Sequence, residues 1–481
     1  MSKVLGRFTG RILLALSLVA FVAGCALSSP RPAWDEPPPA PAEGPIVSTD
    51  DLHRARLANG LEVIVLEDRR LPRISLGFTL RRGAGSVDPE LAGLAAVATE
   101  VMQRGAGEWD ALALAKVVED AGASLSASAG WDTTGVSLSG LAKDRGLLLE
   151  ILEEVATRPR FDDGEFQKAL AEQQASIVAA QDDPSTLIRW NVLRVLYGGH
   201  RYGLPRSGTA ESLARIDVEA ARAYWIDRFV PSNTLFWAVG DFSAEEVIGE
   251  VERRFGSLPD GPVVPNTPPP PLRTPEKRRI VVVDKPDLVQ ARIILAHEGI
   301  SRTEPTRIPV DIMNDVLGGS GFSSRLMMSV RADEGLTYGI GSGFSLRGQP
   351  GPFSISTFTR VAEVRRVIDI LHDELEGIRS DEPVTEEELA KFISYNVGRF
   401  GLSLETSEAV LSSLVDLIVH GLPDDSLDTY RGRVRAVTLD DVRDAAQVRL
   451  APERAAIVLL GPAEELVPQV EDLAPVEVWQ P

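Results

Sequence analysis

Residues 81–105 read RRGAGSVDPELAGLAAVATEVMQRG and join an apolar run to a helical stretch. The run before them, Ile74–Phe78, is rich in β-branched and aromatic residues, which is typical of a strand. Leu91–Gln103 places apolar residues at helical spacing and predicts an amphipathic helix. The stretch therefore predicts a strand followed closely by a helix, and the rest of the chain repeats this plan.

The same order of segments occurs twice along the chain. Strand-like runs are followed by a helical stretch in each half: Gly60–Leu66 and Ile74–Phe78 before Leu91–Gln103, then Ile280–Asp284 and Ala291–Leu295 before Pro309–Leu317. Because short polar turns separate the two runs of each pair, we expect them to be adjacent strands.

Each half then continues with long helices and closes with a strand. Long helices are expected over Glu165–Gln181, Val361–Arg379 and Glu386–Ser403. A helix and a final strand close each half: Asp217–Phe229 with Phe236–Asp241, and Leu439–Leu450 with Ala456–Pro462. The fold class is therefore α+β, with two duplicated α/β-sandwich halves of about 200 residues each.

A proline-rich segment separates the two halves. Leu258–Pro275 contains four consecutive prolines and is typical of an interdomain linker. We therefore assign residues 51–260 to the first half, 261–277 to the linker and 278–475 to the second half.

The first 24 residues are interpreted as a signal peptide. Their apolar run, residues 12–23, follows a basic start and is too short to cross a bilayer core of about 30 Å. Small residues precede Cys25, the only cysteine of the chain, and this pattern resembles the lipobox of bacterial lipoproteins. Cys25 is then the lipid attachment site; the alternative is an ordinary signal peptide with an incidental cysteine.

Residues 25–50 are expected to be a proline-rich tether between the lipid and the folded body. The residue after the cysteine is Ala26 and not an aspartate. In Gram-negative lipoproteins this resembles the pattern of proteins sorted to the outer membrane. We therefore expect a lipid-anchored protein of the cell envelope, at the outer membrane and facing the periplasm.

Composition excludes several function classes. The 70 acidic and 50 basic residues give a net charge of −20, which argues against a nucleic-acid partner. One cysteine allows neither an intramolecular disulfide nor a multi-cysteine zinc site. His297 begins an H-E-x-x-H pattern, but residue 301 is a serine, so the second ligand is missing.

Residues 81–105 resemble the insulinase/pitrilysin-type zinc peptidases, in the processing-peptidase branch. In that family the Gly-Leu-Ala element continues with H-x-x-E-H. Here Ala96 and Glu100 stand at the two histidine positions and Thr99 at the position of the general base. The family's third ligand is a glutamate on a later helix, and no single residue within Phe166–Asp183 is assigned to it. The resemblance implies a chain with no metal site and no cofactor of its own.

The second half keeps the family's other elements, and the resemblance spans roughly residues 52–470. Residues 317–326 resemble its glycine-rich loop and S-R-L helix, and residues 330–338 resemble its R-x-x-x-G-L-x-Y element. The resemblance implies that Arg331 and Tyr338 are catalytic contacts to substrate and oxyanion, in a complex only. An arginine fork grips carbonyl oxygens, and a tyrosine hydroxyl donates to an oxyanion.

Local spacing agrees with such a pair but also allows a structural interpretation. Residues 323–334 are expected to be a helix that Gly335 stops, and residues 336–344 the following strand. Structurally, Arg331 would complement the helix dipole and Tyr338 would fill core.

Gly318, Gly319 and Gly321 are expected to bind substrate as a flexible loop. The alternative is a turn that needs a positive φ.

Two functions from different classes follow. The first is a zinc-free subunit of a heteromeric metallopeptidase, not catalytic alone, which binds peptide beside a homologous H-x-x-E-H subunit that holds the zinc. The second is a non-catalytic envelope protein that binds peptides or scaffolds a complex. An independent zinc peptidase with rearranged ligands is a third, disfavoured by the scattered histidines.

Overall fold

The computed structural model describes residues 52–265 and 277–481. The predicted signal peptide, Cys25, the tether and linker residues 266–276 lie outside the described residues. Across the two described ranges, no helix combines the length and the apolar character that crossing a bilayer requires.

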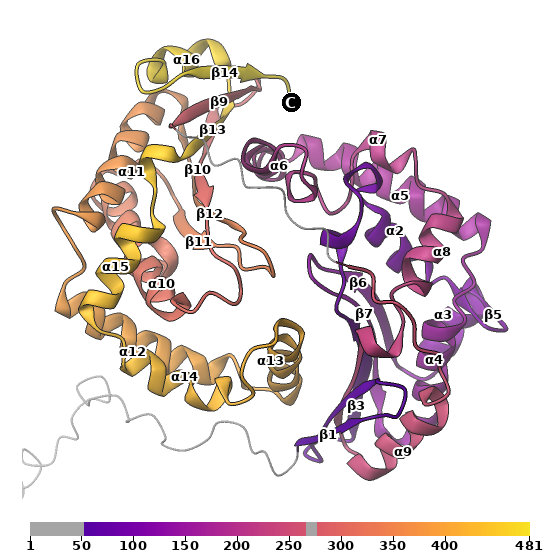
Figure 1. Cartoon of the computed structure of the whole chain (residues 1–481). Coiled ribbons are helices and arrows are strands. Elements are labelled where there is room, and N and C mark those ends of the chain that lie inside the picture. The colour runs from indigo at the N-terminus through magenta and orange to yellow at the C-terminus, as the bar shows by residue number, and fades with distance from the viewer. Residues whose placement is uncertain (1–51, 266–276) are drawn as a thin grey trace, which may run out of the picture. The chain divides into compact units, whose positions relative to one another are not determined.

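The first half contains a six-stranded sheet (Figure 1). Its strands, in spatial order, are β1 Leu52–Arg56, β2 Glu62–Glu67, β8 Thr234–Gly240, β3 Arg73–Leu80, β7 Thr134–Leu141 and β6 Ser124–Ala129. β2 and β8 are parallel, and every other neighbouring pair is antiparallel.

The second half repeats this sheet. Its order is β14 Val476–Trp479, β9 Arg279–Asp284, β13 Ala456–Gly461, β10 Gln290–Glu298, β12 Pro352–Arg360 and β11 Ile340–Phe344. From the second position to the last, its strands match those of the first sheet one for one, which confirms the predicted duplication. The strands at the first position differ, since β1 lies at the start of its half and pairs antiparallel, whereas β14 lies at the end of its half and pairs parallel.

The expectation that the first two strands of each half are neighbours is wrong. β8 lies between β2 and β3, and β13 lies between β9 and β10. Both inserted strands are apolar along almost their whole length and nearly fully buried. An inner position removes the most apolar surface of such a strand from water. The closing strand of each half therefore lies inside the sheet.

The predicted helices are present with ends shifted by a few residues, apart from residues 323–334, which are described with the site. The first half has α2 Leu94–Val101, α3 Ala111–Asp120, α4 Arg145–Thr157, α5 Asp163–Asp182, α6 Pro184–Tyr197, α7 Ala210–Leu213, α8 Val218–Ile226 and α9 Ala244–Phe255. The second half has α10 Arg307–Asn314, α11 Val364–Arg379, α12 Glu386–Leu402, α13 Ser407–His420, α14 Ser426–Arg435, α15 Leu439–Arg449 and α16 Ala463–Val470.

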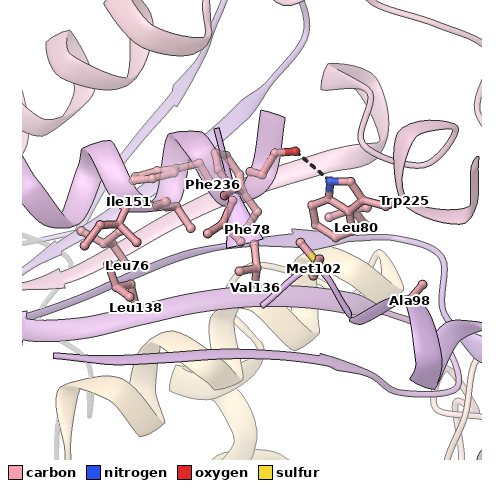
Figure 2. Packing of buried hydrophobic residues seen from close by; sticks show 14 of the residues in the cluster. Leu76, Phe78, Leu80, Ala98, Met102, Val136, Leu138, Ile151, Trp225 and Phe236 are labelled. Atoms are coloured by element: carbon pink, nitrogen blue, oxygen red, sulfur yellow. Dashed lines mark hydrogen bonds between the residues drawn. The ribbon is translucent and has the colours of Figure 1, made fainter. Parts of the chain in front are cut away.

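One face of the first sheet packs against α2, α4 and α8 (Figure 1). Figure 2 shows Leu76 and Phe78 of β3 meeting Ile151 of α4 in this layer. Trp225 of α8 is 1% exposed, and its indole N–H donates to the Ala156 carbonyl at 2.7 Å. The buried indole therefore has its polar atom satisfied, as a core tryptophan requires.

The opposite face of each sheet is covered by a helix from the other half. Leucines of α13 pack on β2 and β8: Leu411, Leu414 and Leu417 against Ile64, Leu66, Leu235 and Val239. Apolar residues of α6 pack on β9, β10 and β13: Leu187, Ile188, Val192 and Val195 against Val281, Val283, Ile294 and Val458. The two halves thus exchange equivalent helices, an arrangement the sequence did not predict.

Candidate functional site

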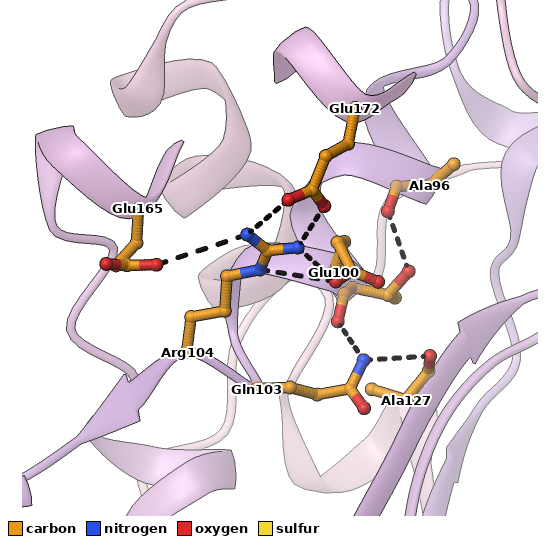
Figure 3. Close-up of polar contacts among 8 residues, drawn as sticks. Ala96, Glu100, Gln103, Arg104, Ala127, Glu165 and Glu172 are labelled. Atoms are coloured by element: carbon orange, nitrogen blue, oxygen red, sulfur yellow. Dashed lines mark hydrogen bonds and ion pairs between the residues drawn. The ribbon is translucent and has the colours of Figure 1, made fainter. Parts of the chain in front are cut away.

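The helix pair α2–α5 carries the positions at which the family resemblance expects zinc ligands. The Nη2 atom of Arg104 lies 2.6 Å from Glu100 Oε1 and 2.5 Å from Glu172 Oε2 (Figure 3). Glu165 lies further out, 4.0 Å from Nη1. A guanidinium therefore stands among three carboxylates at this place.

The charges of this cluster stabilise one another. The hydrogen bond from Arg104 lowers the pKa of Glu172, and the bond to Glu172 raises the pKa of Arg104. The Arg104 side chain is 18% exposed, whereas Glu100 and Glu172 are half-exposed or more. The pair thus stays ionised across the usual pH range and fixes α2 against α5.

The remaining α2 positions have structural partners. The hydroxyl of Thr99 donates to the backbone carbonyls of Ala95 and Ala96, so it offers no general base. The Gln103 amide donates to the Thr99 carbonyl at 2.9 Å and to Ala127 of β6 at 3.3 Å (Figure 3). No group of three metal-ligating side chains occurs among the described residues.

Glu172 is the residue that sequence reasoning missed. It lies in the range 166–183, where the later-helix glutamate was left unassigned. Three-dimensional packing brings it opposite Glu100, through Arg104 (Figure 3). The only signal in the sequence is the helical spacing of Glu165 and Glu172, which puts both on one face of α5.

The second half brings Arg331 and Tyr338 together. The Arg331 guanidinium carbon lies 4.9 Å from the centre of the Tyr338 ring and 4.6 Å from that of Phe322. Tyr338 is 79% exposed and Phe322 73%, so Tyr338 does not fill the core. The result is an exposed arginine–aromatic cluster, in which Phe322 is a member the sequence did not single out.

Local structure around this cluster departs from the expected helix and strand. Met327–Asp333 is a π-helix, a rare form found often at functional sites. The following strand begins at Ile340, so Tyr338 lies in the connecting loop and not in the strand. Gly335 has φ +64 and ends the helix as predicted.

Buried hydrogen bonds hold the loop that carries Tyr338. The Leu336 N–H donates to the Val330 carbonyl at 3.0 Å. The Thr359 hydroxyl donates to the Leu336 carbonyl at 2.7 Å. The Thr357 hydroxyl donates to the Gly339 carbonyl at 3.0 Å, so the backbone is fixed on both sides of the tyrosine, while its ring extends into solvent.

The three glycines of the neighbouring loop have different requirements. A Cβ on Gly318 would lie 2.6 Å from Ser342 Oγ, and one on Gly319 2.4 Å from Asn314 Nδ2. Gly321 has φ +74 and open space around it. Close packing thus requires the first two glycines and the turn favours the third; contact with substrate stays a prediction for all three.

These features together define an insulinase-type peptidase fold whose first half has an ion-pair cluster where metal ligands are expected. The chain belongs to the M16 peptidase family. Residues 63–210 match the family described as insulinase (peptidase family M16), and residues 215–395 match the family described as peptidase M16 inactive domain.

Relatives include zinc-protease-like and inactive-type proteins. The chain is 24% identical to the uncharacterized zinc protease YmxG of Bacillus subtilis, over 86% of this chain and 98% of that protein. It is 24% identical to the non-peptidase homolog YmxG of Helicobacter pylori, over 79% and 87%. A solved peptidase M16 inactive domain from Pseudomonas fluorescens aligns with TM-score 0.77 and 26% identity, over 86% and 98%.

The inactive-domain match fits a chain without zinc of its own, as does the absence of a metal-binding group from the residues that the structure describes.

Proposed function

We propose that this protein is the zinc-free subunit of a heteromeric M16 metallopeptidase. It binds a peptide substrate and supplies Arg331 and Tyr338 to the zinc site of an H-x-x-E-H partner. The observation that carries this proposal is the exposed Arg331–Tyr338 pair, kept while the ligand positions of α2 hold other residues.

Each side chain has a distinct chemical role in this proposal. A zinc ion held by the histidines and glutamate of the partner would supply Lewis-acid polarisation of the scissile carbonyl. The Tyr338 hydroxyl donates a hydrogen bond to the oxyanion as it forms. The Arg331 guanidinium binds substrate carbonyl oxygens with its fork of N–H groups.

Co-expression with an H-x-x-E-H homologue tests the proposal. The complex should cleave peptides, and Tyr338→Phe should lower kcat/KM by about 100- to 1000-fold, because one oxyanion donor is lost. Tyr395→Phe is the matched control, since Tyr395 is also exposed, at 39%, but lies on α12. Equal activity of the Tyr338→Phe complex and the parent complex would refute the role of Tyr338.

A non-catalytic peptide-binding or scaffold role is the second candidate. The Arg104 cluster and the relative named a non-peptidase homolog favour it. It predicts that no complex with an H-x-x-E-H homologue hydrolyses peptides, although the chain still associates with peptide or partner. Hydrolysis on adding the partner would exclude this second candidate.

We also propose that Cys25 is acylated and anchors the chain at the outer membrane, facing the periplasm. The support is the small-residue pattern before the only cysteine. Expressed in a Gram-negative host, the chain should incorporate labelled palmitate and sediment with outer membranes, and Cys25→Ser should abolish both. Palmitate incorporation by the Cys25→Ser chain would contradict the assignment, because no other thiol is present.

A further inference from the structure

A cavity of about 620 Å³ lies between the first sheet and α13, and it is called the α13 cavity here. Its volume falls within the range of roughly 300–1,000 Å³ found for ligand sites. The sheet face that it borders changes in character across the strands. Towards β2 and β8 this face is apolar and seats the leucines of α13. Towards β6 and β7 it is lined by serines.

The serine rows follow from strand alternation. Ser124 and Ser126 of β6, and Ser137 and Ser139 of β7, occupy alternate positions, so each pair points to one face. All four line the cavity. Such rows present hydroxyl donors and acceptors at the spacing of an extended main chain, which suits an extended peptide.

A buried arginine lines the α13 cavity without an acceptor. Arg347, from the segment joining β11 to β12, is 5% exposed. Its guanidinium carbon lies 4.4 Å from the Trp131 ring centre and 4.5 Å from that of Tyr202. Among the described residues, its Nε and Nη1 atoms have no hydrogen-bond partner. A buried guanidinium that stacks on aromatic rings and leaves two nitrogen atoms without a hydrogen bond is costly and favours an anionic partner.

The nearby carboxylates already have other partners. Asp132 accepts a hydrogen bond from the Gly348 N–H at 2.9 Å. The Nε2 atom of His420 lies 3.8 Å from Asp132 Oδ2. Asp416 accepts from Arg302 at 2.9 Å and lies 3.1 Å from His420. These carboxylates form a charge cluster with His420 and Arg302. Asp132 also attracts Arg347 electrostatically, but neither carboxylate makes a hydrogen bond to it.

The cavity also has length. Glu408 and His420, at opposite ends of α13, both line it. Twelve helical residues span about 18 Å at 1.5 Å each. An extended chain rises about 3.3 Å per residue, so this length corresponds to about five peptide residues.

We propose that the α13 cavity binds the C-terminal end of a short peptide, with Arg347 anchoring the free carboxylate and the serines of β6 and β7 contacting the main chain. A guanidinium binds a carboxylate with paired hydrogen bonds, which an amide terminus cannot reproduce. The inference rests on the proposed function only in taking a peptide as the ligand. It adds that this ligand is recognised by its C-terminus.

The test compares ligands that differ only at the C-terminus. A pool of random pentapeptides with free carboxylates, and the same pool amidated, are dialysed to equilibrium against the full chain, and bound peptide is measured by mass spectrometry. The free-acid pool should bind at least about 10-fold more tightly, as a charge-assisted hydrogen bond requires. Equal binding of both pools, or no binding of either, would overturn the proposal.

Small carboxylates form a third arm. Acetate and free alanine should compete weakly, because they do not reach the serine rows. Competition by acetate at the concentration at which peptides compete would overturn the peptide assignment and identify a site for small carboxylates.

Two variants check the site within the protein. Arg347→Gln should remove the preference for free carboxylates, and Arg360→Gln, an exposed arginine paired with Glu363, should keep it. Ser126→Trp, at an exposed position of β6, should block binding without burial of the new ring in the core. Retention of the full carboxylate preference by Arg347→Gln, or undiminished peptide binding by Ser126→Trp, would overturn the proposal.

This test is independent of cleavage. Tyr338→Phe should bind peptide normally even where it prevents hydrolysis. Carboxylate-dependent binding by a chain that supports no hydrolysis with any partner would refute only the proposed peptidase role. Hydrolysis combined with carboxylate-independent binding would refute only the inference about Arg347.

Discussion

The helix pairs α2–α5 and α10–α12 occupy equivalent places in the two halves, but the carboxylates beside them differ in burial and in hydrogen-bond partner. In the first pair, Glu100 and Glu172 share the guanidinium of Arg104 near the surface. Beside the second pair, Asp315, which begins the π-helix Asp315–Gly319 directly after α10, is 7% exposed and accepts the amide of Asn396 from α12 at 2.7 Å. Burial raises the pKa of Asp315, whereas the Arg104 contact lowers that of Glu172.

The difference shows that equivalent helix pairs can keep their packing while they stabilise carboxylates in different ways. A carboxylate near water is stabilised by an arginine at modest cost, because the charges stay partly solvated. A buried carboxylate needs a neutral donor or a proton, because removal from water penalises the charge. The two halves therefore share the arrangement of these helices but differ in how the carboxylates beside them are stabilised.

The largest effect is expected from a variant that converts the helix pair α2–α5 into a metal site. The variant Ala96→His, Thr99→Glu, Glu100→His, Arg104→Leu places two histidines and a glutamate around Glu172 and removes the resident cation. Zinc content, measured by plasma mass spectrometry, should rise from background to about one ion per chain.

The control for this gain keeps Arg104 and changes only the three α2 residues. It should bind zinc more weakly, since the guanidinium still pairs with Glu172. If the fourfold variant holds no more zinc than the parent chain, α2 and α5 are not placed as a metal-binding pair.

A smaller effect is expected in the second pair. Asn396→Ala leaves the Asp315 carboxylate buried without its amide donor and should cost about 2 kcal/mol of unfolding free energy at pH 7. Because the pKa of Asp315 is raised in the folded state, protonation at low pH should relieve the loss. Urea unfolding at pH 7 and pH 4.5 measures both.

Gln103→Ala serves as the comparison from the first half. Its amide donates to carbonyls and not to a carboxylate, so its cost should be the same at both pH values. A pH-independent cost for Asn396→Ala would contradict the account of Asp315.

The smallest effect concerns the exchanged helices. Most of α13 is held by apolar contacts, but its C-terminal end carries a charge cluster. In this cluster Asp132 and Asp416 raise the pKa of His420 to about 10. A raised folded-state pKa means that the stabilisation is complete below pH 6.5, falls as the pH rises, and is lost above about 10.

His420→Gln should therefore lower the Tm at pH 6 and have little effect at pH 10.5, by thermal unfolding at both values. The expected cost at pH 6 is about 1 kcal/mol, because the imidazolium is mostly buried. An equal loss of Tm at both pH values would show that packing, and not charge, explains the role of His420.

The sequence predicted most elements of the fold and half of the candidate site. Apolar periodicity identified β3, α2, α5 and α12, because burial of one face repeats at a fixed spacing. Motif spacing also paired Arg331 with Tyr338, since only a helix end and a short loop separate them. Glu172 and Phe322 were missed, because their contacts depend on packing between segments that the sequence pattern does not relate.

By itself, the sequence determined that two duplicated α+β halves exist and that α2 lacks histidine ligands, since both follow from residue identity and local spacing. Only the tertiary structure decided that the closing strands enter the middle of each sheet and that α6 and α13 cross to the other half. These outcomes depend on which apolar surfaces meet after collapse. The same long-range packing places Arg104 against Glu172 and Arg347 against Trp131, pairs whose members lie far apart in the sequence.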